Sequence, residues 1–338
     1  MDYDIMCGDK KIAEYAQDRL HPVDDRLLPM FLRSHSFIRW VEQRAIDGDR
    51  TNARMLKKAH GMNRTSPDFE TAMKYHAATI TDNFWVKEAS ESITWDEVRF
   101  TDDIYFRMAI SSDDSAFARK PSRTPELTNI GSREKGWRLI DGRWWLYKKD
   151  EFPEHELVAY QIGRLMGFDM AVYELQDGLI RTQDFTGGRM NLQHMDALTE
   201  SEDYAENYRL IRQLSPEDGK RYLDIICLDT IINNPDRHTK NYGFLTSQTD
   251  GSILRFAPNY DNDMALYGVN QPWFEFTVSN QMMEEFIVFC EKESVRYTVP
   301  QLQPEAVREI CSCLMNGDEI AEYIINRRNA LAGSIAPE

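Results

Sequence analysis

The sequence lacks any apolar run long enough to cross a membrane. No hydrophobic stretch approaches 18 residues, which is roughly the length of a spanning helix, and the N-terminus, Met-Asp-Tyr-Asp, lacks the charged and apolar pattern of a signal peptide. We therefore expect a cytoplasmic protein with no membrane partner, unless it is exported by a route that the sequence does not show.

Cysteine and positive charge are also scarce. The five cysteines are scattered and include no C-x-x-C pair, which argues against a zinc site or a disulfide framework and indicates free thiols in a reducing compartment. The sequence has 40 Lys and Arg residues against 56 Asp and Glu residues, which gives a net charge of −16. Because a nucleic-acid surface needs clustered Lys and Arg, we expect no direct nucleic-acid partner. ATP is not excluded, since bound metal carries much of its charge.

The chain is long enough, at 338 residues with 42% hydrophobic content, for one two-lobed domain or two domains. Residues 1–120 read as a polar, mostly helical segment that packs on the main domain, and a recognition surface for a protein partner is the alternative. No internal repeat or low-complexity tract interrupts the sequence.

The most informative stretch lies between residues 222 and 263. The apolar run Tyr222–Ile232 has the length of a buried helix, and Asn233-Asn234-Pro235 stops it. A polar loop, Asp236–Asn241, follows. Two strand-like runs, Tyr242–Thr246 and Ser252–Ala257, then flank a Thr-Asp-Gly turn signal, which predicts a hairpin.

The polar loop has the spacing D-x-x-x-x-N, which protein kinases place after a buried helix. There the Asp accepts the proton of the attacking hydroxyl, the Asn holds a metal ion, and a second Asp after a hairpin holds metal against the phosphates. Asp236, Asn241 and Asp261 stand in that order. Magnesium prefers such oxygen ligands. A solvated turn is the alternative, because Asn, Asp and Pro are ordinary turn residues.

A second set of signals precedes this stretch. Strands are predicted at Trp137–Ile140 and Arg143–Lys148, joined by the hairpin dipeptide Asp141-Gly142. Pro153 then opens a helix that carries Glu156 in its first turn. A strand Lys148 followed by a helix Glu156 is what a kinase needs to hold the α- and β-phosphates, although a solvated lysine and a helix-starting glutamate are the simpler alternative.

Five segments in order carry a resemblance to a known family: G-S-R-E-K, W-W-L-Y-K, E-L-V-A-Y-Q-I-G-R-L-M-G, N-N-P-D-R-H-T-K-N-Y-G and P-N-Y-D. Over about residues 120–330 the sequence resembles the HipA-like serine/threonine kinases, which include toxin kinases of bacterial toxin–antitoxin pairs and free-standing relatives. The resemblance implies an α+β, two-lobed protein-kinase-like fold. Residues 121–185 would form a small β-rich N-lobe, and residues 186–338 a helical C-lobe with the catalytic loop and the metal-binding hairpin.

The resemblance also implies roles for individual residues. Asp236 matches the catalytic base, Lys148 the ATP-phosphate lysine and Glu156 its helix partner. Asn241 and Asp261 match the metal ligands, and His238 would orient the loop by hydrogen bonding. The other matches are the phosphate loop at Gly131, Ser132 and Lys135, the adenine hinge at Gln183 and Phe185, and a regulatory phosphorylation site at Thr128, with Ser132 as the competing site.

Some positions depart from the family pattern. Pro235 replaces a Thr before the catalytic Asp, and Asn259 replaces the Phe of an F-Y-D triplet. Asp263 could share the metal or be solvated. Because residues 1–120 do not match the toxins' N-terminal subdomain, the target and the antitoxin interface do not transfer.

The predicted function is ATP- and Mg-dependent phosphorylation of Ser or Thr on a protein substrate, with autophosphorylation and a possible antitoxin or regulatory protein as partner. Two alternatives stay open: a pseudokinase that binds nucleotide without turnover, and another transferase on the same scaffold, such as a lipid kinase or a nucleotidyl transferase.

Overall fold

The structure is a computed structural model that describes residues 2–111, 123–131 and 133–337. Two compact units divide the chain, the first drawn from residues 1–150, 181–198 and 243–254 and the second from residues 151–180, 199–242 and 255–338. The chain therefore passes between the units five times, after residues 150, 180, 198, 242 and 254.

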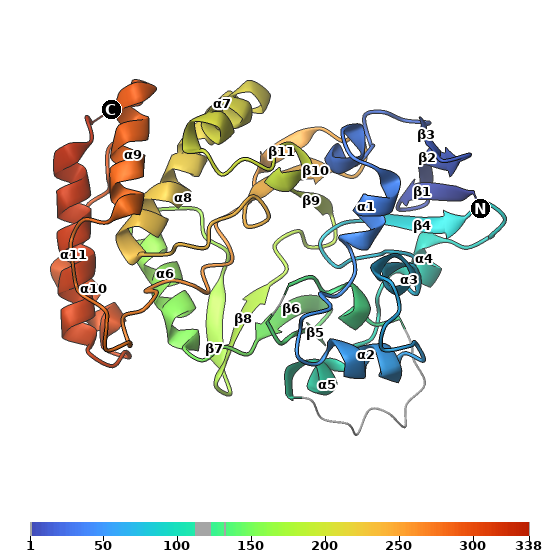
Figure 1. The fold of residues 1–338 in the computed structure, drawn as a ribbon, viewed down its shortest axis with the longest axis horizontal. Helices are drawn as coiled ribbons and strands as arrows, with labels where there is room; N and C mark the ends of the chain where they lie inside the picture. Colours follow the sequence, from blue (N-terminus) through green and yellow to red (C-terminus); the bar gives the residue numbers. More distant parts are fainter. Residues whose placement is uncertain (1, 112–122, 132, 338) are drawn as a thin grey trace. The chain divides into compact units, whose positions relative to one another are not determined.

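The first unit begins with a four-stranded antiparallel sheet in the order β3-β2-β1-β4 (Figure 1). Its strands are β1 (Tyr3–Cys7), β2 (Lys10–Ala16), β3 (Arg19–Pro22) and β4 (Phe84–Glu88). The sequence predicts mostly helix over residues 1–120, with a short strand or loop at residues 83–86 and another at residues 95–98, so the strands β1, β2 and β3 are a difference. The buried Asp4 lies 2.6 Å from Lys11 on the neighbouring strand. Charges of this kind interrupt the apolar alternation by which a strand is recognised.

The other elements among the described residues up to 128 are short helices: η1 (Met30–Arg33), α1 (Phe37–Glu42), α2 (Ala53–Ala59), α3 (Asp68–Met73), α4 (Trp95–Val98), α5 (Phe106–Ser111) and η3 (Glu126–Thr128). The sequence predicts a strand or loop at residues 95–98. A helix forms there instead because Thr94 and Glu97 make a capping box.

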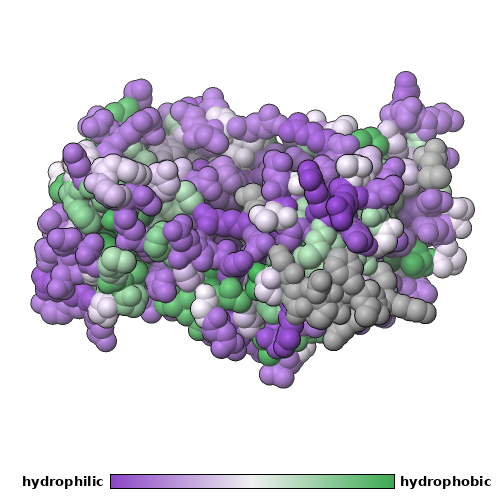
Figure 2. All heavy atoms as spheres, turned by 60° about the horizontal axis from the view of Figure 1, so that its bottom comes forward, coloured by the Kyte–Doolittle hydropathy of each residue, from purple (hydrophilic) through white to green (hydrophobic). Residues whose placement is uncertain are grey.

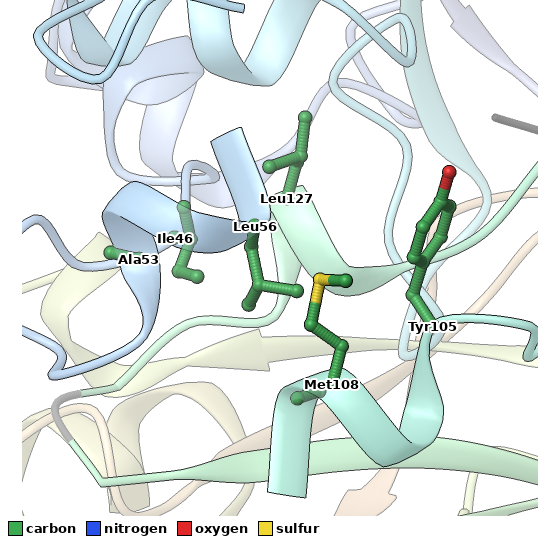
Figure 3. Close-up of a cluster of buried hydrophobic side chains, with 7 residues drawn as sticks. Ile46, Ala53, Leu56, Tyr105, Met108 and Leu127 are labelled. Atoms are coloured by element: carbon green, nitrogen blue, oxygen red, sulfur yellow. The ribbon is translucent and has the colours of Figure 1, made fainter. Parts of the chain in front are cut away.

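A buried hydrophobic cluster joins three of these helices (Figure 3). Leu56 comes from α2, Met108 from α5 and Leu127 from η3, and Ile46, Ala53, Tyr105 and Ala109 complete the cluster. The amide of Ile46 donates to the carbonyl of Leu127 at 2.7 Å. The cluster therefore fixes the position of η3. The chain then leads into residues 130–134, which are called the glycine loop below.

Two further groups of strands lie mainly in the first unit, with β8 and β11 each crossing its boundary. β5 (Lys135–Ile140) and β6 (Arg143–Lys148) form the predicted hairpin, in which Asp141 and Gly142 both have positive φ, as a type I′ turn requires. β8 (Leu179–Gln183) lies next to β6, and β7 (Tyr173–Gln176) of the second unit precedes it in the chain. The second group has the order β11-β10-β9, with β9 (Met190–His194), β10 (Gly243–Ser247) and β11 (Ile253–Phe256).

The second unit is mainly helical. Its helices are α6 (Pro153–Leu165), α7 (Tyr204–Leu214), α8 (Gly219–Ile232), α9 (Gln281–Lys292), α10 (Pro304–Cys311) and α11 (Gly317–Ser334), and the short η5 (Pro216–Asp218) precedes α8. The helix predicted at residues 222–232 is confirmed as α8. Eleven of its fourteen residues are buried, and it contacts α6, α7, α9 and α11. The helix ends as predicted, because its C-cap Asn233 adopts the left-handed conformation.

The surface in Figure 2 is mostly hydrophilic, with hydrophobic side chains in small separate groups. Within the described part of the chain, no helix combines the length and apolar content needed to span a membrane.

Candidate active site

The loop that follows α8, residues 236–241, is called the catalytic loop below. Its first residue, Asp236, is exposed, and its last, Asn241, is 4% exposed. The side-chain amide of Asn241 donates to the carbonyl of Asp236 at 3.1 Å, and its backbone amide donates to the carbonyl of His238 at 2.8 Å. The His238 ring nitrogen Nδ1 accepts from the amide of Lys240 at 3.3 Å. The loop is therefore closed on itself, with its acidic end presented outward.

A buried ion pair anchors the catalytic loop to α8. Arg237 donates from Nε and Nη2 to the two carboxylate oxygens of Asp229, at 2.8 and 2.9 Å. The two side chains are 6% and 2% exposed. Asn234, which is also buried, donates to the same carboxylate at 2.9 Å. Bidentate pairing of this kind fixes orientation as well as distance.

The same guanidinium also holds the segment that carries Asp261. Nη1 of Arg237 donates to the carbonyls of Asn241 and Tyr260, at 3.0 and 2.8 Å, and Nη2 donates to the side-chain oxygens of Asn259 and Asn262, at 3.2 and 2.6 Å. Burial alone would lower the pKa of Arg237, but the neighbouring carboxylates, Asp229 first, raise it, so the group stays charged. Arg237 thus brings the catalytic loop and the segment before Asp261 together.

Asp261 has a left-handed backbone, with φ of 59°. Such a conformation in a non-glycine residue is uncommon and is held by its surroundings. Here the Asp261 amide donates to the Tyr173 hydroxyl at 2.9 Å, and the next amide, of Asn262, donates to the carboxylate of Glu156 at 3.1 Å. Glu156 is 1% exposed. It belongs to the second unit and Lys148 to the first, so the predicted pairing of Lys148 with Glu156 stays a prediction.

Asn259, which stands where the family pattern has Phe, is buried and makes hydrogen bonds. Besides accepting from Arg237, Asn259 donates its amide to the carbonyl of Asp169 at 2.8 Å and accepts from the amide of Ala171 at 2.9 Å. A hydrogen-bonded position therefore stands where an aromatic ring is expected, and it still ties the segment to the unit's core.

Oxygen donors for a hard cation are present in this region. Asn241 and Asp261 supply an amide and a carboxylate oxygen from the two segments that Arg237 joins. Among the described residues, no three or more His, Cys, Asp or Glu side chains gather as a metal-binding group. This sparse set fits magnesium, which takes one or two carboxylates and completes its shell with phosphates and water.

In the first unit, two lysines lie directly opposite each other. Lys135 of β5 and Lys148 of β6 are partners in the antiparallel register, so their side chains leave the same face of the hairpin. Lys148 is 4% exposed. The next residue, Lys149, is exposed instead and pairs with Glu134 at 2.8 Å.

The loop before β5 brings Gly131 beneath Lys135. Gly131 has φ of 113°, a conformation that other residues rarely adopt, and a Cβ there would collide with the Lys135 ammonium. Thr128 is 4% exposed, and its hydroxyl donates to the carbonyl of Pro125 at 3.4 Å. Ser132, also predicted to bind phosphate, lies outside the described residues.

The predicted adenine hinge begins at Gln183, the last residue of β8. Gln183 and Phe185 are both partly buried. Between them, the amide of Asp184 donates to the carbonyl of Trp144 at 2.9 Å, and the Asp184 carboxylate accepts from the amide of Thr186, also at 2.9 Å. Because the Asp184 amide is engaged, hydrogen bonds to a base would fall to the flanking residues.

The family can be assigned from this point. A family model, the HipA-like C-terminal domain, matches residues 131–317, more than half of the chain. The chain belongs to the HipA-like family. The match begins at the glycine next to Lys135 and includes both the loop 236–241 and Asp261, so every predicted site residue that the structure describes, except Thr128, lies inside it.

One solved structure supports the fold of this HipA-like chain. HipA of Shewanella oneidensis MR-1, from a complex of a toxin–antitoxin system, aligns with 98% of the chain and 96% of its own length, at 11% identity and a TM-score of 0.52. The Helicobacter pylori proinflammatory kinase CtkA aligns with 60% of the chain and 90% of its own length, at 15% identity and a TM-score of 0.43. A search of curated proteins found no match. The predicted two-lobed, kinase-like α+β fold is confirmed.

Sequence reasoning missed the residues that organise the catalytic loop. Asp229 carries a signal, because an acid inside an otherwise apolar helix must have a buried partner. The D-R-H motif contains that partner, Arg237, but which acid it meets depends on the fold. The two asparagines at 259 and 262 carry no such signal.

Removing Arg237 should be costly, because Asp229 would remain buried without its cation. We expect Arg237→Met to lower the free energy of unfolding by about 3–5 kcal/mol. Chemical denaturation followed by circular dichroism measures this change. The control is Arg255→Met, which breaks the half-exposed pair of Arg255 and Asp169 at 2.8 Å and should cost less than about 1 kcal/mol. Equal losses in the two variants would contradict the anchoring role of Arg237.

Proposed function

We propose that this chain is an ATP- and Mg-dependent protein kinase that phosphorylates Ser or Thr. One observation carries the proposal. The buried Arg237 holds the catalytic loop and the segment before Asp261 on a single guanidinium, so that a base and two oxygen ligands for metal come from one rigid framework.

In the proposed reaction, Asp236 accepts the proton of the substrate hydroxyl as that oxygen bonds to the γ-phosphorus, and the bond from phosphorus to the ADP oxygen breaks. Asn241 and Asp261 would hold the magnesium, which supplies positive charge against the phosphates. General-base assistance is worth about 10²–10⁴-fold, so positioning and electrostatics must supply most of the rate.

On the nucleotide side, we assign the phosphates to the face that carries Lys135 and Lys148. Their register in the hairpin supports this, because it brings two cationic side chains to one face, where they attract an anionic phosphate. The loop at Gly131 and Ser132 would cover the phosphates with backbone amides. The flanks of the hinge, Gln183 and Phe185, would meet adenine. These roles fall in residues 121–185, the proposed nucleotide-binding part, and those of catalysis in residues 186–338, together with Glu156.

Partners are proposed with one correction. The Shewanella structure is a complex of HipA with HipB and operator DNA, so the expectation that this chain has no direct nucleic-acid partner is not supported. An antitoxin-like or regulatory protein partner is part of the proposal.

Intact-mass measurement after incubation with Mg-ATP separates the proposal from its alternatives. A kinase gains phosphate on itself or on an added protein, a nucleotidyl transferase adds AMP, and a pseudokinase adds nothing. The proposed activity would be overturned if AMP were added to a protein. It would also be overturned if neither this chain nor any protein of an added host lysate gained mass.

Autophosphorylation is expected at Thr128. Because the hydroxyl is buried, added phosphate cannot stay in place, and its charge should expel η3 and the glycine loop and lower activity. Peptide mapping after incubation with Mg-ATP locates the modification, and Thr128→Ala is the control that should not be modified at this position. Phosphate found only on Ser132, or a modified protein as active as the bare one, would refute the prediction.

The two adjacent lysines should differ in their effect on ATP use. Lys148→Ala removes a buried cation from the face shared with Lys135, so the KM for ATP should rise tenfold or more. A tenfold rise corresponds to a loss of about 1.4 kcal/mol of binding free energy. Lys149→Ala removes only an exposed charge and serves as the control. Steady-state kinetics decide, and the reverse pattern would place the phosphate-binding lysine one residue later.

Base and metal ligand should fail differently when removed. Asp236→Ala should bind Mg-ATP normally and lose phosphoryl transfer, since the base contributes little to ground-state affinity. Asp261→Ala should lose transfer and also the magnesium dependence of ATP affinity. Calorimetric titration with and without magnesium tests both, with Asp263→Ala as the control. Magnesium-dependent binding that survives in Asp261→Ala and vanishes in Asp263→Ala would move the metal to Asp263.

A further inference from the structure

A buried arginine from the N-terminal segment contacts the base of the glycine loop. Arg50 lies in the turn before α2 and is 2% exposed. Its guanidinium donates to three backbone carbonyls: Nη1 to Asn129 at 3.4 Å, and Nη2 to Ala109 at 3.2 Å and to Lys135. Its Nε has no hydrogen-bond partner among the described residues. All of the hydrogen bonds from this side chain therefore end on main chain.

Two of these carbonyls mark the ends of the loop. Asn129 comes two residues before Gly131, and Lys135 is the first residue of β5. The side-chain amide of Asn129 also donates to the carbonyl of Lys135, at 3.2 Å. The two ends of residues 130–134 are thus joined twice, once by Asn129 and once by Arg50. The third carbonyl, of Ala109, lies in the last turn of α5, where helix carbonyls lack helical partners.

We propose that Arg50 is a positioning residue for phosphate binding, which holds the backbone at Asn129 and Lys135 so that Gly131 and Lys135 are in place before ATP arrives. This inference rests on the proposed function and assigns residues 1–120 a part in it. A loop that is ordered in advance does not lose conformational freedom when the ligand binds, and the affinity rises accordingly.

The chemistry of the site requires arginine. The planar guanidinium directs several N–H groups at once, whereas a lysine ammonium on its flexible stem cannot bridge three fixed carbonyls. Burial lowers the pKa of Arg50 to about 10, opposed by Glu126, Glu134 and Asp47, so the side chain remains a cation near neutral pH.

The test compares two matched arginine-to-lysine variants. Arg50→Lys keeps the charge and loses the three-carbonyl clamp. The control is Arg44→Lys in the same unit, because Arg44 is likewise buried but its bonds go to Asp82, at 2.7 and 3.0 Å, and to the carbonyls of Ala77 and Phe84. Calorimetry and kinetics should show the Kd and KM for Mg-ATP rising about tenfold in Arg50→Lys, with a smaller change in kcat. A tenfold change is what the loss of roughly one hydrogen bond from a charged donor would produce. Arg44→Lys should bind Mg-ATP as the unchanged protein does.

Hydrogen exchange without nucleotide separates this inference from the proposed function. Amides of residues 129–136 should exchange faster in Arg50→Lys and not in Arg44→Lys. Unchanged exchange there, or equal loss of ATP affinity in both variants, would overturn the clamp. If the unchanged protein binds no ATP, the proposed function fails, while the exchange result still decides whether Arg50 orders the loop.

Should Arg50→Lys not fold, Asn129→Ala removes the second link without touching a buried charge. It should accelerate the same amides and weaken Mg-ATP, and unchanged values of both would equally reject the inference.

Discussion

The pairing of Arg237 with Asp229 is the interaction on which the rest of the second unit's site depends. A buried charge pair contributes little net stability compared with apolar packing, since desolvation offsets much of the attraction. The contribution of this pair is to orient the segments that it joins. One planar group with five donors links a helix, the loop that follows it and a segment more than twenty residues later in the chain. A hydrophobic replacement could fill the space but could not orient three backbone segments at once.

The first unit solves a similar problem with Arg50. There the acceptors are backbone carbonyls, and no carboxylate bonds to the guanidinium among the contacts of the described residues. In both units an arginine next in the chain to a short helix or loop reaches main chain distant in sequence. Each unit therefore holds its irregular functional segment by charge-assisted hydrogen bonds to backbone, which keep a loop in one conformation without requiring it to have regular secondary structure.

Local patterns predicted a large share of this structure. α8 follows from its apolar run and its Asn-Asn-Pro stop, the β5–β6 hairpin from Asp141-Gly142, and the start of α6 from Pro153. These signals act between neighbours in the chain. The first three strands of the N-terminal sheet were missed because the buried Asp4 and its partner Lys11 give these strands mixed polarity. The partners of Arg50, and those of Arg237 in the segment 259–262, were missed because they are more than twenty residues away, where periodicity and turn propensity carry no information. Asp229 is only eight residues from Arg237, but which acid the arginine meets depends on the fold. Motif order located the candidate residues, and the hydrogen bonds that hold their backbones came only from the fold.

The path of the chain through the two units has a consequence for how the protein can be divided. Because the chain enters and leaves the first unit repeatedly, no single cut releases either unit as a continuous polypeptide. The strands β9 and β10 of the first unit are separated in sequence by α7 and α8 of the second. Ribosomal synthesis therefore cannot complete the first unit until the buried helix of the second has been made. Folding of the two units is thus coupled by chain connectivity, and a fragment that ends before residue 243 lacks the strand that pairs with β9.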